Sequence, residues 1–461
     1  MIKLFAILAD RFNKAGKELY LVGGSVRDRL LRRPSPDLDF ATNATPSETE
    51  ELLSQPWPEG TRISIYKIGE KFGTIGAVID GQRVEITTYR GERYDETRKP
   101  EVEFLHSLED DLARRDFTIN AMAMAVDGKI IDPFGGRSDL VGRYLRAVGN
   151  PEDRFGEDPL RMLRAIRFAC QLGFEIERDT YTAIIRRART LQKISWERKA
   201  EEMNKILLSS RPSEGLKLLY NSYLLDYVIP ELLPMIGLQQ RGDYHHKDVW
   251  RHTLQVVENI APDLTLRWAA LLHDIAKPAT KTVDGTEVHF FGHEVLGAEM
   301  AGKILQRLRF SSELVERITK LIRMHQRINL YESDWTTGAV RRFVREAGDE
   351  LPLLFALSRA DITSQREIKV AARLALVREL EQRIEQLRLE EETEKIKSPL
   401  DGNELMAIFG RQPGPWIREV KERLLNAVLD GEIAPDDKAG AESIARELLA
   451  GETTQIETTA G

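Results

Sequence analysis

Asp37 and Asp39 follow closely on a two-glycine turn, and this spacing is the strongest chemical signal in the 461-residue chain. Residues 19–22 are apolar and predict a buried strand, after which Gly23 and Gly24 let the backbone approach a phosphate closely, because neither has a Cβ. Asp37 and Asp39 alternate with apolar residues, so both carboxylates point to one side if the segment is a strand. Paired carboxylates opposite such a turn suit Mg²⁺ that bridges a nucleoside triphosphate.

A helix beginning at about Ser25 is predicted to aim its free backbone N–H groups at the same place. The blander interpretation is a solvated loop that carries two stray aspartates. The glycine turn, Arg27 and the spacing to Asp37 together favour a nucleotide site over that loop.

Residues 110–121 form a compact polar cluster that runs into an apolar helix. Within it, Arg115 could hold a triphosphate and Asn120 could fix a loop. A helix-capping network explains the same residues, and the cluster taken alone favours that network. The turn at residues 132–136 is also open to a purely structural explanation.

Asp158 and Arg161 lie near the start of a predicted helix, on either side of Pro159. Arginine offers a rigid fork of donors and aspartate offers only acceptors, so the pair can match the Watson–Crick edge of a base. The alternative is an intrahelical salt bridge worth about 0.2–0.5 kcal/mol. That alternative leaves unexplained Arg164 and Arg167, which follow at helical spacing on the same broad face.

Strand signals are concentrated in the first part of the chain. Residues 1–148 alternate strands and helices, and from about Pro151 onward helical periodicity takes over. Hairpin turns are predicted at two Asp-Gly pairs, Asp80-Gly81 and Asp127-Gly128. A break at residues 398–402 marks the start of a helical tail. The pattern predicts an α+β protein with a mixed α/β head and an elongated, all-helical remainder.

The composition is that of a globular chain, with 42% hydrophobic and 31% charged residues. No apolar run approaches the roughly 20 residues of a membrane helix, and the first residues predict an amphipathic helix instead of a signal peptide. Cys170 is the only cysteine, which excludes an internal disulfide, and it is predicted to lie in the core. These features predict a cytoplasmic protein without a membrane segment.

The net charge of −7 argues against a surface coated in positive potential, but it leaves room for a local basic groove. Residues 154–199 are dense in arginine and lysine. A solvated helix face explains any single residue there.

Five motifs in this order resemble those of class II CCA-adding tRNA nucleotidyltransferases. They are GGxxRD with DxD, RRDFTINA, DPFGG, EDxxR and the segment at residues 196–205. The resemblance covers about residues 1–210 strongly and the tail from Leu400 more loosely. It implies a head similar to the nucleotidyltransferase palm, followed by a helical neck, body and tail that hold the tRNA acceptor end. The domains it implies are a head at 1–148, a neck at 149–210, a body connection at 211–240, an HD-type domain at 241–395 and a tRNA-contacting tail at 396–461.

Carried over by position, the resemblance implies that Asp37 and Asp39 are catalytic Mg²⁺ ligands. The nucleotide-binding residues that it implies are Gly24, Arg27, Arg115, Asp158, Arg161, Arg164 and Arg167. The implied reaction is in-line attack of the tRNA 3′-hydroxyl on an α-phosphate, which adds C, C and A from CTP and ATP without a template.

Residues 90–100 resemble the flexible loop of the family, which relatives that add only CC have shortened. Its presence favours an enzyme that can add A, and it leaves open whether the product is full CCA or a single A. Bacterial poly(A) polymerases share the head motifs, but they usually carry basic C-terminal extensions, which this acidic tail lacks.

A second candidate site consists of His252, His273, Asp274 and Asp361. Histidine and aspartate drawn from several helices suit a buried divalent transition metal. His273 and Asp274 are costly to bury in an apolar run unless something satisfies both groups. The pattern resembles the HD phosphohydrolase superfamily over about residues 240–375, and it implies these four residues as the metal ligands.

His293 and His325 resemble accessory residues of HD enzymes, which bind phosphate or a second metal. HD domains hydrolyse phosphomonoesters and 2′,3′-cyclic phosphates, which suggests the hypothesis that this domain repairs damaged tRNA 3′ ends. A degenerate domain kept for its packing is the alternative. Two other classes are weighed against the leading one: a phosphohydrolase whose head only recruits RNA, and a non-catalytic RNA-binding protein.

Overall fold

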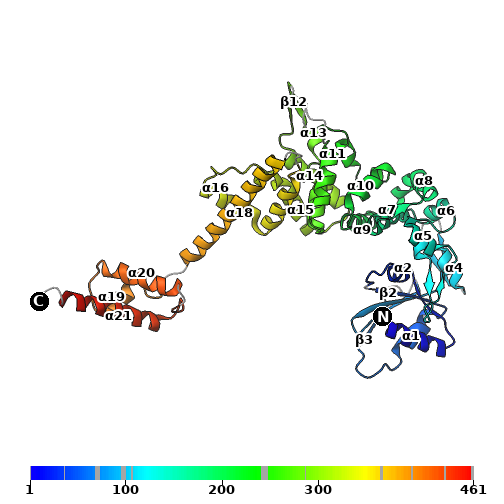
Figure 1. Ribbon diagram of the computed structural model, residues 1–461, viewed down its shortest axis with the longest axis horizontal. Coiled ribbons are helices and arrows are strands. Elements are labelled where there is room, and N and C mark those ends of the chain that lie inside the picture. The colour runs from blue at the N-terminus through cyan, green and yellow to red at the C-terminus, as the bar shows by residue number, and fades with distance from the viewer. Residues whose placement is uncertain are drawn as a thin grey trace. The chain divides into compact units, whose positions relative to one another are not determined.

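The computed structural model forms two compact units. One comprises residues 1–329 with 349–365, and the other residues 330–348 with 366–461. The residues that the structure describes are 2–35, 37–67, 73–94, 100–104, 107–239, 248–285, 287–363, 367–395, 398–429 and 432–457. Residues 95–99 of the predicted flexible loop therefore lie outside the described residues. Figure 1 shows a sheet at the N-terminal end of the first unit and helices beyond it.

The head is built on one mixed sheet whose strand order is β3-β4-β5-β2-β1-β8-β9. The head strands are β1 (Leu19–Val22), β2 (Asp37–Thr42), β3 (Ile63–Tyr66), β4 (Thr74–Ile79), β5 (Gln82–Thr88), β6 (Arg90–Tyr94), β7 (Pro100–Phe104), β8 (Ala123–Met124) and β9 (Ile130–Ile131). β6 and β7 form a separate antiparallel hairpin. Both predicted Asp-Gly hairpins are confirmed, because β4 pairs with β5 and β8 with β9, each in antiparallel register.

Strand β2 is central to the head, since it pairs with β1 in antiparallel fashion and with β5 in parallel. Its Leu38 and Phe40 are fully buried on one face, where Phe40 packs against Phe5 with ring centroids 5.1 Å apart. The alternation of a strand therefore directs Asp37 and Asp39 to the opposite face. The head helices are α1 (Ile2–Lys14), α2 (Gly24–Leu30), α3 (Pro46–Ser54), α4 (Leu108–Ala113), α5 (Gly136–Gly142) and the 3-10 helix η2 (Thr118–Asn120).

The rest of the first unit is helical. Its α-helices are α6 (Pro151–Glu157), α7 (Leu160–Leu172), α8 (Arg178–Arg187), α9 (Trp196–Leu207), α10 (Pro212–Asn221), α11 (Val249–Asn259), α12 (Leu264–Leu272), α13 (Lys277–Thr280), α14 (His293–Arg307), α15 (Ser312–Asn329) and α17 (Leu351–Asp361). Short 3-10 helices are η3 (Ala188–Lys193), η4 (Leu225–Tyr227) and η5 (Pro230–Met235). Cys170 is buried in α7, as predicted. Fully buried Trp268 on α12 donates from its indole nitrogen to Asn204 Oδ1 on α9 at 2.7 Å, which ties the later helices to the earlier ones.

Two short pairings depart from the all-helical prediction. β10 (Tyr144–Leu145) pairs in parallel with β11 (Glu175–Ile176), and β12 (Thr282–Asp284) forms a hairpin with β13 (Glu287–His289). Asp284 ends β12 and pairs with Glu287, and Gly285 follows it with a φ of +59°, so an Asp-Gly pair also stands at this turn in the sequence.

The second unit is all-helical in the ranges described. Its helices are α16 (Thr337–Ala347), α18 (Glu367–Lys395), α19 (Gly402–Phe409), α20 (Trp416–Leu429) and α21 (Lys438–Glu457). The break predicted at residues 398–402 separates α18 from α19, where Asp401 and Glu404 form a capping box. The last three helices share a core that includes Leu405, Leu424 and Ala445.

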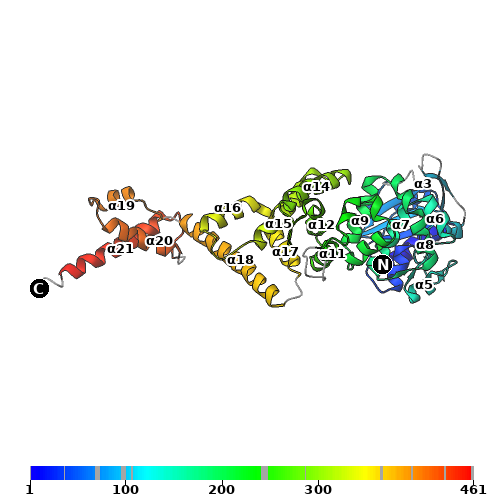
Figure 2. The ribbon, with the colours of Figure 1, turned by 90° about the horizontal axis from the view of Figure 1, so that it is seen from above.

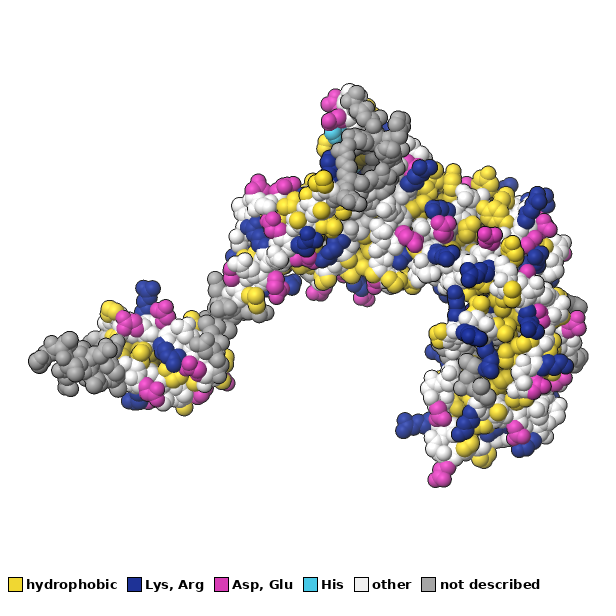
Figure 3. Space-filling view, in the orientation of Figure 1, with side chains coloured by type: hydrophobic (Ala, Val, Ile, Leu, Met, Phe, Trp, Pro, Cys, Tyr) yellow, Lys and Arg dark blue, Asp and Glu magenta, His cyan; other side chains and the backbone are white. Residues whose placement is uncertain are grey.

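The predicted α+β class, with its mixed head and helical remainder, is confirmed. Figure 3 shows acidic and basic side chains interspersed over the visible face of each unit, in keeping with the net charge of −7. In the part of the chain that the structure describes, no helix is both long and apolar enough to span a bilayer.

Candidate active site and metal centre

A cavity of about 620 Å³ opens between the head sheet and the first neck helices. Its lining brings together seven of the nine residues predicted for catalysis or nucleotide binding, namely Gly24, Arg27, Asp39, Arg115, Asp158, Arg161 and Arg164. Asp37 and Arg167 are not among the lining residues. The structure therefore assembles most of the predicted site from segments more than 100 residues apart.

Asp37 and Asp39 lie on β2 beside the helix that follows the glycine turn. Ser25 links the two segments, because its Oγ donates to the Asp37 carbonyl at 3.1 Å and accepts from the Asp39 backbone N–H at 3.0 Å. The Asp37 side chain is half-exposed, and one of its oxygens lies 4.0 Å from Arg83 Nε. Both carboxylates thus share one face of the strand, as the alternation predicted.

Glu85 on β5 adds a third carboxylate that was not predicted as a site residue. It stands opposite Asp39 in the parallel β2–β5 register. Burial, then Glu85 and Asp37, raise the pKa of Asp39 to about 6, although Arg115 and Arg27 oppose the shift. The signal was present in the sequence, because Glu85 alternates with buried Val84 and Ile86.

Carboxylates hold the guanidinium groups of Arg27 and Arg115 in place. Arg27 donates to both oxygens of Asp28, and its Nη1 donates to Asn120 Oδ1 at 2.8 Å. Arg115 Nη2 donates to the buried carboxylate of Asp111 at 3.0 Å. Their remaining N–H groups are thereby placed around the cavity in fixed orientations.

Gly23 is the point of closest approach between the turn and these arginines. Its φ is +66°, and a Cβ added there stands 2.7 Å from Arg115 Nη1. Only glycine allows both this positive φ and this close approach of Arg115 without strain.

Asp116 anchors the neck side of the cavity. Arg164 donates to its Oδ2 and Asn120 donates to its Oδ1 at 3.0 Å. Burial disfavours the charged form, but Arg164, Asn120 and Arg161 outweigh it and lower the pKa of Asp116 to about 2. The polar cluster at residues 110–121, for which a helix-capping network was the simpler prediction, thus contributes to a charged network that faces the cavity.

Asp158 and Arg161 both line the cavity, but each has its own partner in place of the other. Asp158 Oδ1 accepts from the Leu160 N–H, and its Oδ2 accepts from Arg198 Nη2 at 2.8 Å. Arg161 donates to Glu157 Oε2 at 2.8 Å and to the Arg114 carbonyl at 2.9 Å. Arg198 was not predicted as a separate site residue, because it lies 40 positions away on α9 and only the fold brings it to Asp158.

Arg167 takes a different position from the other predicted arginines. Its Nε lies 3.2 Å from a carboxylate oxygen of Glu202 on α9, and both side chains are buried. The guanidinium also stacks on Phe168, 4.3 Å from the ring centroid. In this structure Arg167 therefore joins α7 to α9.

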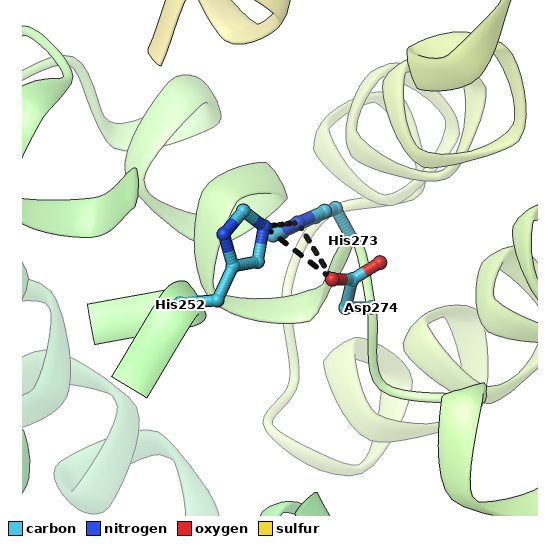
Figure 4. Close-up of side chains that lie close together, drawn as sticks. All are labelled: His252, His273 and Asp274. Carbon is cyan, nitrogen blue, oxygen red and sulfur yellow. Dashed lines mark hydrogen bonds and ion pairs between the residues drawn. The ribbon is translucent and has the colours of Figure 1, made fainter. Parts of the chain in front are cut away.

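A second site lies among the later helices of the first unit. Figure 4 shows the rings of His252 and His273 directed at Asp274. His252 Nε2 lies 2.8 Å from Asp361 Oδ1 and 3.5 Å from Asp274 Oδ2, and His273 Nε2 lies 3.2 Å from the same Asp274 oxygen. The four residues predicted as HD ligands therefore converge, and three of them satisfy the spacing needed to hold one ion.

His293 and His325 approach the other oxygen of the same carboxylate. Their Nε2 atoms lie 3.4 Å and 4.0 Å from Asp274 Oδ1. Asp274, His293 and His325 form a second group with the spacing of a metal site. Asp274 is common to both groups, so its two oxygens face two separate pairs of imidazoles.

In all four histidines the Nδ1 atom, which faces away from Asp274, already has a hydrogen-bond partner. The Nδ1 atoms pair with the carbonyls of Ala270, Phe290 and Ile322 in His273, His293 and His325, and with Thr363 Oγ1 in His252. A carbonyl can only accept, so in His273, His293 and His325 it fixes a proton on Nδ1 and leaves the Nε2 lone pair as the possible metal ligand. In His293 that lone pair also faces Gln326 Nε2 at 3.1 Å.

The two aspartates of this centre draw positive charge to it, and Lys277 supplies part of that charge, because its Nζ donates to Asp274 Oδ2 at 2.7 Å. Burial disfavours a positive charge on His273, but Asp274 and Asp361 outweigh it and raise the pKa of His273 to about 10. Burial and the neighbouring His273 lower the pKa of His325 to about 4. A divalent cation can take the place of the proton that the two aspartates draw to His273, so the donor set fits a metal.

Family comparisons agree with this division of the chain. Residues 19–146 match the model of the poly A polymerase head domain, and residues 173–236 match a probable RNA and SrmB-binding site of polymerase A. Residues 249–366 match the HD domain. The fold and sites thus define a nucleotidyltransferase-type head joined to an HD domain, both of which imply the use of divalent metals.

Full-length relatives identify the family. The chain is 34% identical over 425 residues to a CCA-adding enzyme of Geobacillus sp. (strain WCH70), covering 91% of this chain and 90% of that protein. It is also 34% identical to the A-adding tRNA nucleotidyltransferase of Deinococcus radiodurans, with 91% and 94% covered. This protein belongs to the family of the CCA-adding enzymes, as its motifs predicted.

Solved structures show the same architecture. The Bacillus stearothermophilus CCA-adding enzyme in complex with CTP has a TM-score of 0.60 at 27% identity, with 98% of this chain and 99% of that chain covered. The Thermotoga maritima CCA-adding enzyme complexed with tRNA has a TM-score of 0.56 at 21% identity, with 97% and 95% covered, and shows the likeness of fold alone.

Proposed function

We propose that this protein adds C, C and then A to the 3′ end of tRNA, using CTP and ATP and no nucleic-acid template. The observation that carries the proposal is the single cavity lined by Asp39, the glycine turn and the pair Asp158 and Arg161. A polymerising carboxylate, a triphosphate cradle and base-reading groups meet there. Support also comes from the full-length relatives named CCA-adding enzymes and from the relative solved with CTP.

The metal proposed for the head is Mg²⁺, held by Asp37 and Asp39 with Glu85 beside them. The fit rests on charge, because the neighbouring carboxylates help to raise the pKa of Asp39 and a hard dication relieves that repulsion. When bound, Mg²⁺ lowers the pKa of the attacking 3′-hydroxyl and neutralises charge on the phosphates.

The triphosphate is proposed to lie against Gly24, Arg27 and Arg115. Asp28, Asn120 and Asp111 already orient the two guanidinium groups, so binding costs little side-chain entropy. Fixed donors around the developing charge are the main way in which such sites stabilise a transition state.

Base selection is proposed for Asp158 and Arg161. Cytosine and adenine both present an exocyclic amino group beside a ring-nitrogen acceptor, and a carboxylate with a guanidinium complements that edge. Arg198 and the Leu160 N–H hold the two Asp158 oxygens, so the carboxylate has a fixed orientation. Arg164 acts further away through Asp116, and Arg167 through the packing of α7 on α9.

The HD centre is proposed to hold divalent transition-metal ions and to hydrolyse phosphomonoesters or 2′,3′-cyclic phosphates. His252, His273, Asp274 and Asp361 supply the first ion with ligands. Asp274 with His293 and His325 would supply a second ion with ligands, and Asp274 is common to both sets. When bound, such ions activate a water molecule and polarise a phosphate. Repair of a damaged tRNA end before nucleotide addition is the role this chemistry suits.

The domain division proposed for these activities is a head at 1–148, a neck at 149–210, a body connection at 211–240, an HD domain at 241–395 and a tail at 396–461. It is supported by the family matches at 19–146 and 249–366, which fall within the proposed head and HD domain.

A specialised A-adding enzyme is the second candidate, because the Deinococcus radiodurans relative of that name is as similar, at 34% identity, as the CCA-adding ones. Incubating the protein with tRNA lacking its last three, two or one nucleotides separates the candidates, with CTP and ATP supplied separately and then together. CCA addition predicts that CTP alone adds two residues to the shortest tRNA and that ATP then adds one. An enzyme that adds A from ATP but never adds C from CTP to any of the three substrates is an A-adder. A long A tract identifies a poly(A) polymerase. A failure to extend any of the three refutes the proposal.

A further inference from the structure

The second unit contains a groove of about 380 Å³ between α16 and α18, two helices that Figures 1 and 2 place side by side. The residues that line it are Arg341, Arg342, Val344, Arg345, Ile384, Leu387 and Arg388. Four of these seven are arginines, and no acidic residue is among them. The groove is thus a local concentration of positive charge in a chain whose net charge is −7.

The packing of α16 fixes where these arginines point. The helix buries Val340, Phe343 and Ala347, all at 2% exposure or less. With 3.6 residues per turn, a helix anchored along that stripe must present Arg342 and Arg345 away from the core. On α18, Ile384 is buried and Arg388 follows one turn later at an exposed position. The helices cannot turn the guanidinium groups inward without exposing their core residues.

The ion-pair pattern points to an anion from outside. Arg342, Arg345 and Arg388 form no ion pair with any residue in the described ranges, whereas Arg373 and Arg423 of the same unit pair with Glu332 and Glu432. Like charges held together without partners destabilise the folded state. A bound anion relieves that repulsion.

We propose that this arginine groove binds the phosphate backbone of the RNA substrate. Guanidinium forks match phosphate oxygens in bidentate fashion, and several arginines along one groove suit a chain of phosphates better than one small anion. Val344, Ile384 and Leu387 give the groove an apolar floor for sugar faces and for the arginine stems. The identity of that RNA as tRNA rests on the proposed function.

The test is a triple substitution in the full-length chain, Arg342→Gln, Arg345→Gln and Arg388→Gln. The dissociation constant for tRNA is measured by fluorescence anisotropy across a series of KCl concentrations. Each lost phosphate contact lowers the slope of log K against log salt by about 0.7–0.9, so we expect a reduction of about 2 and at least tenfold weaker binding at low salt.

A matched control removes three exposed positive charges elsewhere, through Lys3→Gln, Lys129→Gln and Arg137→Gln in the head. It changes net charge equally, and we expect its salt slope to stay near that of the wild type. Equal slopes for the two triple variants overturn the proposal. Thermal unfolding checks that both fold, and Arg345→Lys alone, which keeps the charge, is expected to lose less affinity than Arg345→Gln.

The same proteins separate this proposal from the proposed function. Extension of saturating tRNA by CTP is expected to keep its kcat in the groove variant while the KM for tRNA rises. If the wild-type protein binds tRNA more tightly than the groove variant but never extends it, the groove proposal stands and the proposed function is contradicted. If the groove variant keeps the wild-type affinity for tRNA and adds CCA normally, the proposed function stands and the RNA-binding role of the groove is contradicted. Polyglutamate that binds the groove as tightly as tRNA does at the same salt assigns it to an acidic protein and also overturns the proposal.

Discussion

Asp39 lies beside Asp37 and opposite Glu85, and burial, reinforced by these two carboxylates, raises its pKa to about 6. A folded protein gains nothing in stability from such a cluster. The arrangement becomes favourable only when a cation binds, which is the relation expected of a metal site.

The raised pKa of Asp39 has a consequence for stability. Between its ordinary value of 3.8 and about 6 the folded state holds a proton that the unfolded state has released. Stability therefore falls as pH rises through that window. Asp39→Asn is expected to raise the free energy of unfolding of metal-free protein by roughly 1–2 kcal/mol at pH 8 and to change it little at pH 4. Urea unfolding at both pH values checks this.

The control for that experiment is Asp10→Asn, since Asp10 is exposed and pairs with Lys14, which is also exposed, one helical turn away. It is expected to leave stability nearly unchanged at pH 8. A gain of equal size at pH 4 and pH 8 in the Asp39 variant contradicts the assignment of its pKa.

Arg198 is expected to govern nucleotide choice through Asp158. Uracil places a carbonyl oxygen where cytosine places an amino group, and a carboxylate held in position repels it. Arg198→Gln frees one Asp158 oxygen, so we expect the ratio of kcat/KM for CTP over UTP to fall about tenfold, with Arg198→Lys in between. Primer extension with each nucleotide measures the ratio.

Arg186→Gln is the matched control for Arg198, because Arg186 is exposed on α8 and lies 3.7 Å from Glu152. Its CTP-to-UTP ratio is expected to stay that of the wild type. If Arg198→Gln slows both nucleotides equally, Arg198 supports the fold and does not position Asp158.

At the scale of elements, the turn between β1 and α2 is limited by backbone geometry. Gly23 and Gly128 both have positive φ, +66° and +87°, but a Cβ meets Arg115 only at Gly23 and nothing within 4 Å at Gly128. Alanine at either site is expected to cost about 1 kcal/mol of stability. Only Gly23→Ala is expected to raise the KM for CTP, by about tenfold, since only it displaces Arg115. Equal KM values in the two variants contradict the placement of the triphosphate.

The helices of the HD centre supply four imidazoles to one carboxylate, and this geometry predicts a metal count. Wild-type protein loaded with Mn²⁺ and freed of excess is expected to retain about two ions in this centre, with the spin coupling of a close pair in its EPR spectrum. His293→Gln is expected to lose one ion and the coupling, and to lose activity on 2′,3′-cyclic phosphates. Both proteins are counted in an Asp37→Ala background, which excludes metal bound at the head. A count of one ion in both contradicts a second ion site at Asp274, His293 and His325.

At the scale of the whole molecule, local signals predicted the head well. Asp-Gly pairs predicted two hairpins, and the alternation around Asp37 and Asp39 predicted that the two carboxylates share one face of their strand. Both predictions succeed because turns and alternation depend on a few adjacent residues. The hairpin of β12 and β13 was missed although Asp284-Gly285 carried the same signal, since the surrounding helical periodicity outweighed it.

Contacts between distant segments could not be predicted from the sequence. Arg198 reaches Asp158 across 40 positions, and Arg161 pairs with Glu157, so the alternative of a salt bridge between Asp158 and Arg161 is not what the structure has. Three of the Nδ1 partners of the HD histidines are backbone carbonyls, which have no residue-specific signature. Such pairings depend on how helices pack, which side-chain type alone does not determine.

The most direct test of the account is Asp37→Ala, measured as CTP incorporation into tRNA that lacks its CCA end. Asp37 is half-exposed, so its removal leaves the core and the RNA-binding surfaces intact. We expect incorporation to fall on the order of a thousandfold while the dissociation constant for tRNA stays within about twofold. Wild-type incorporation by this variant contradicts the proposal that the paired aspartates carry out nucleotidyl transfer.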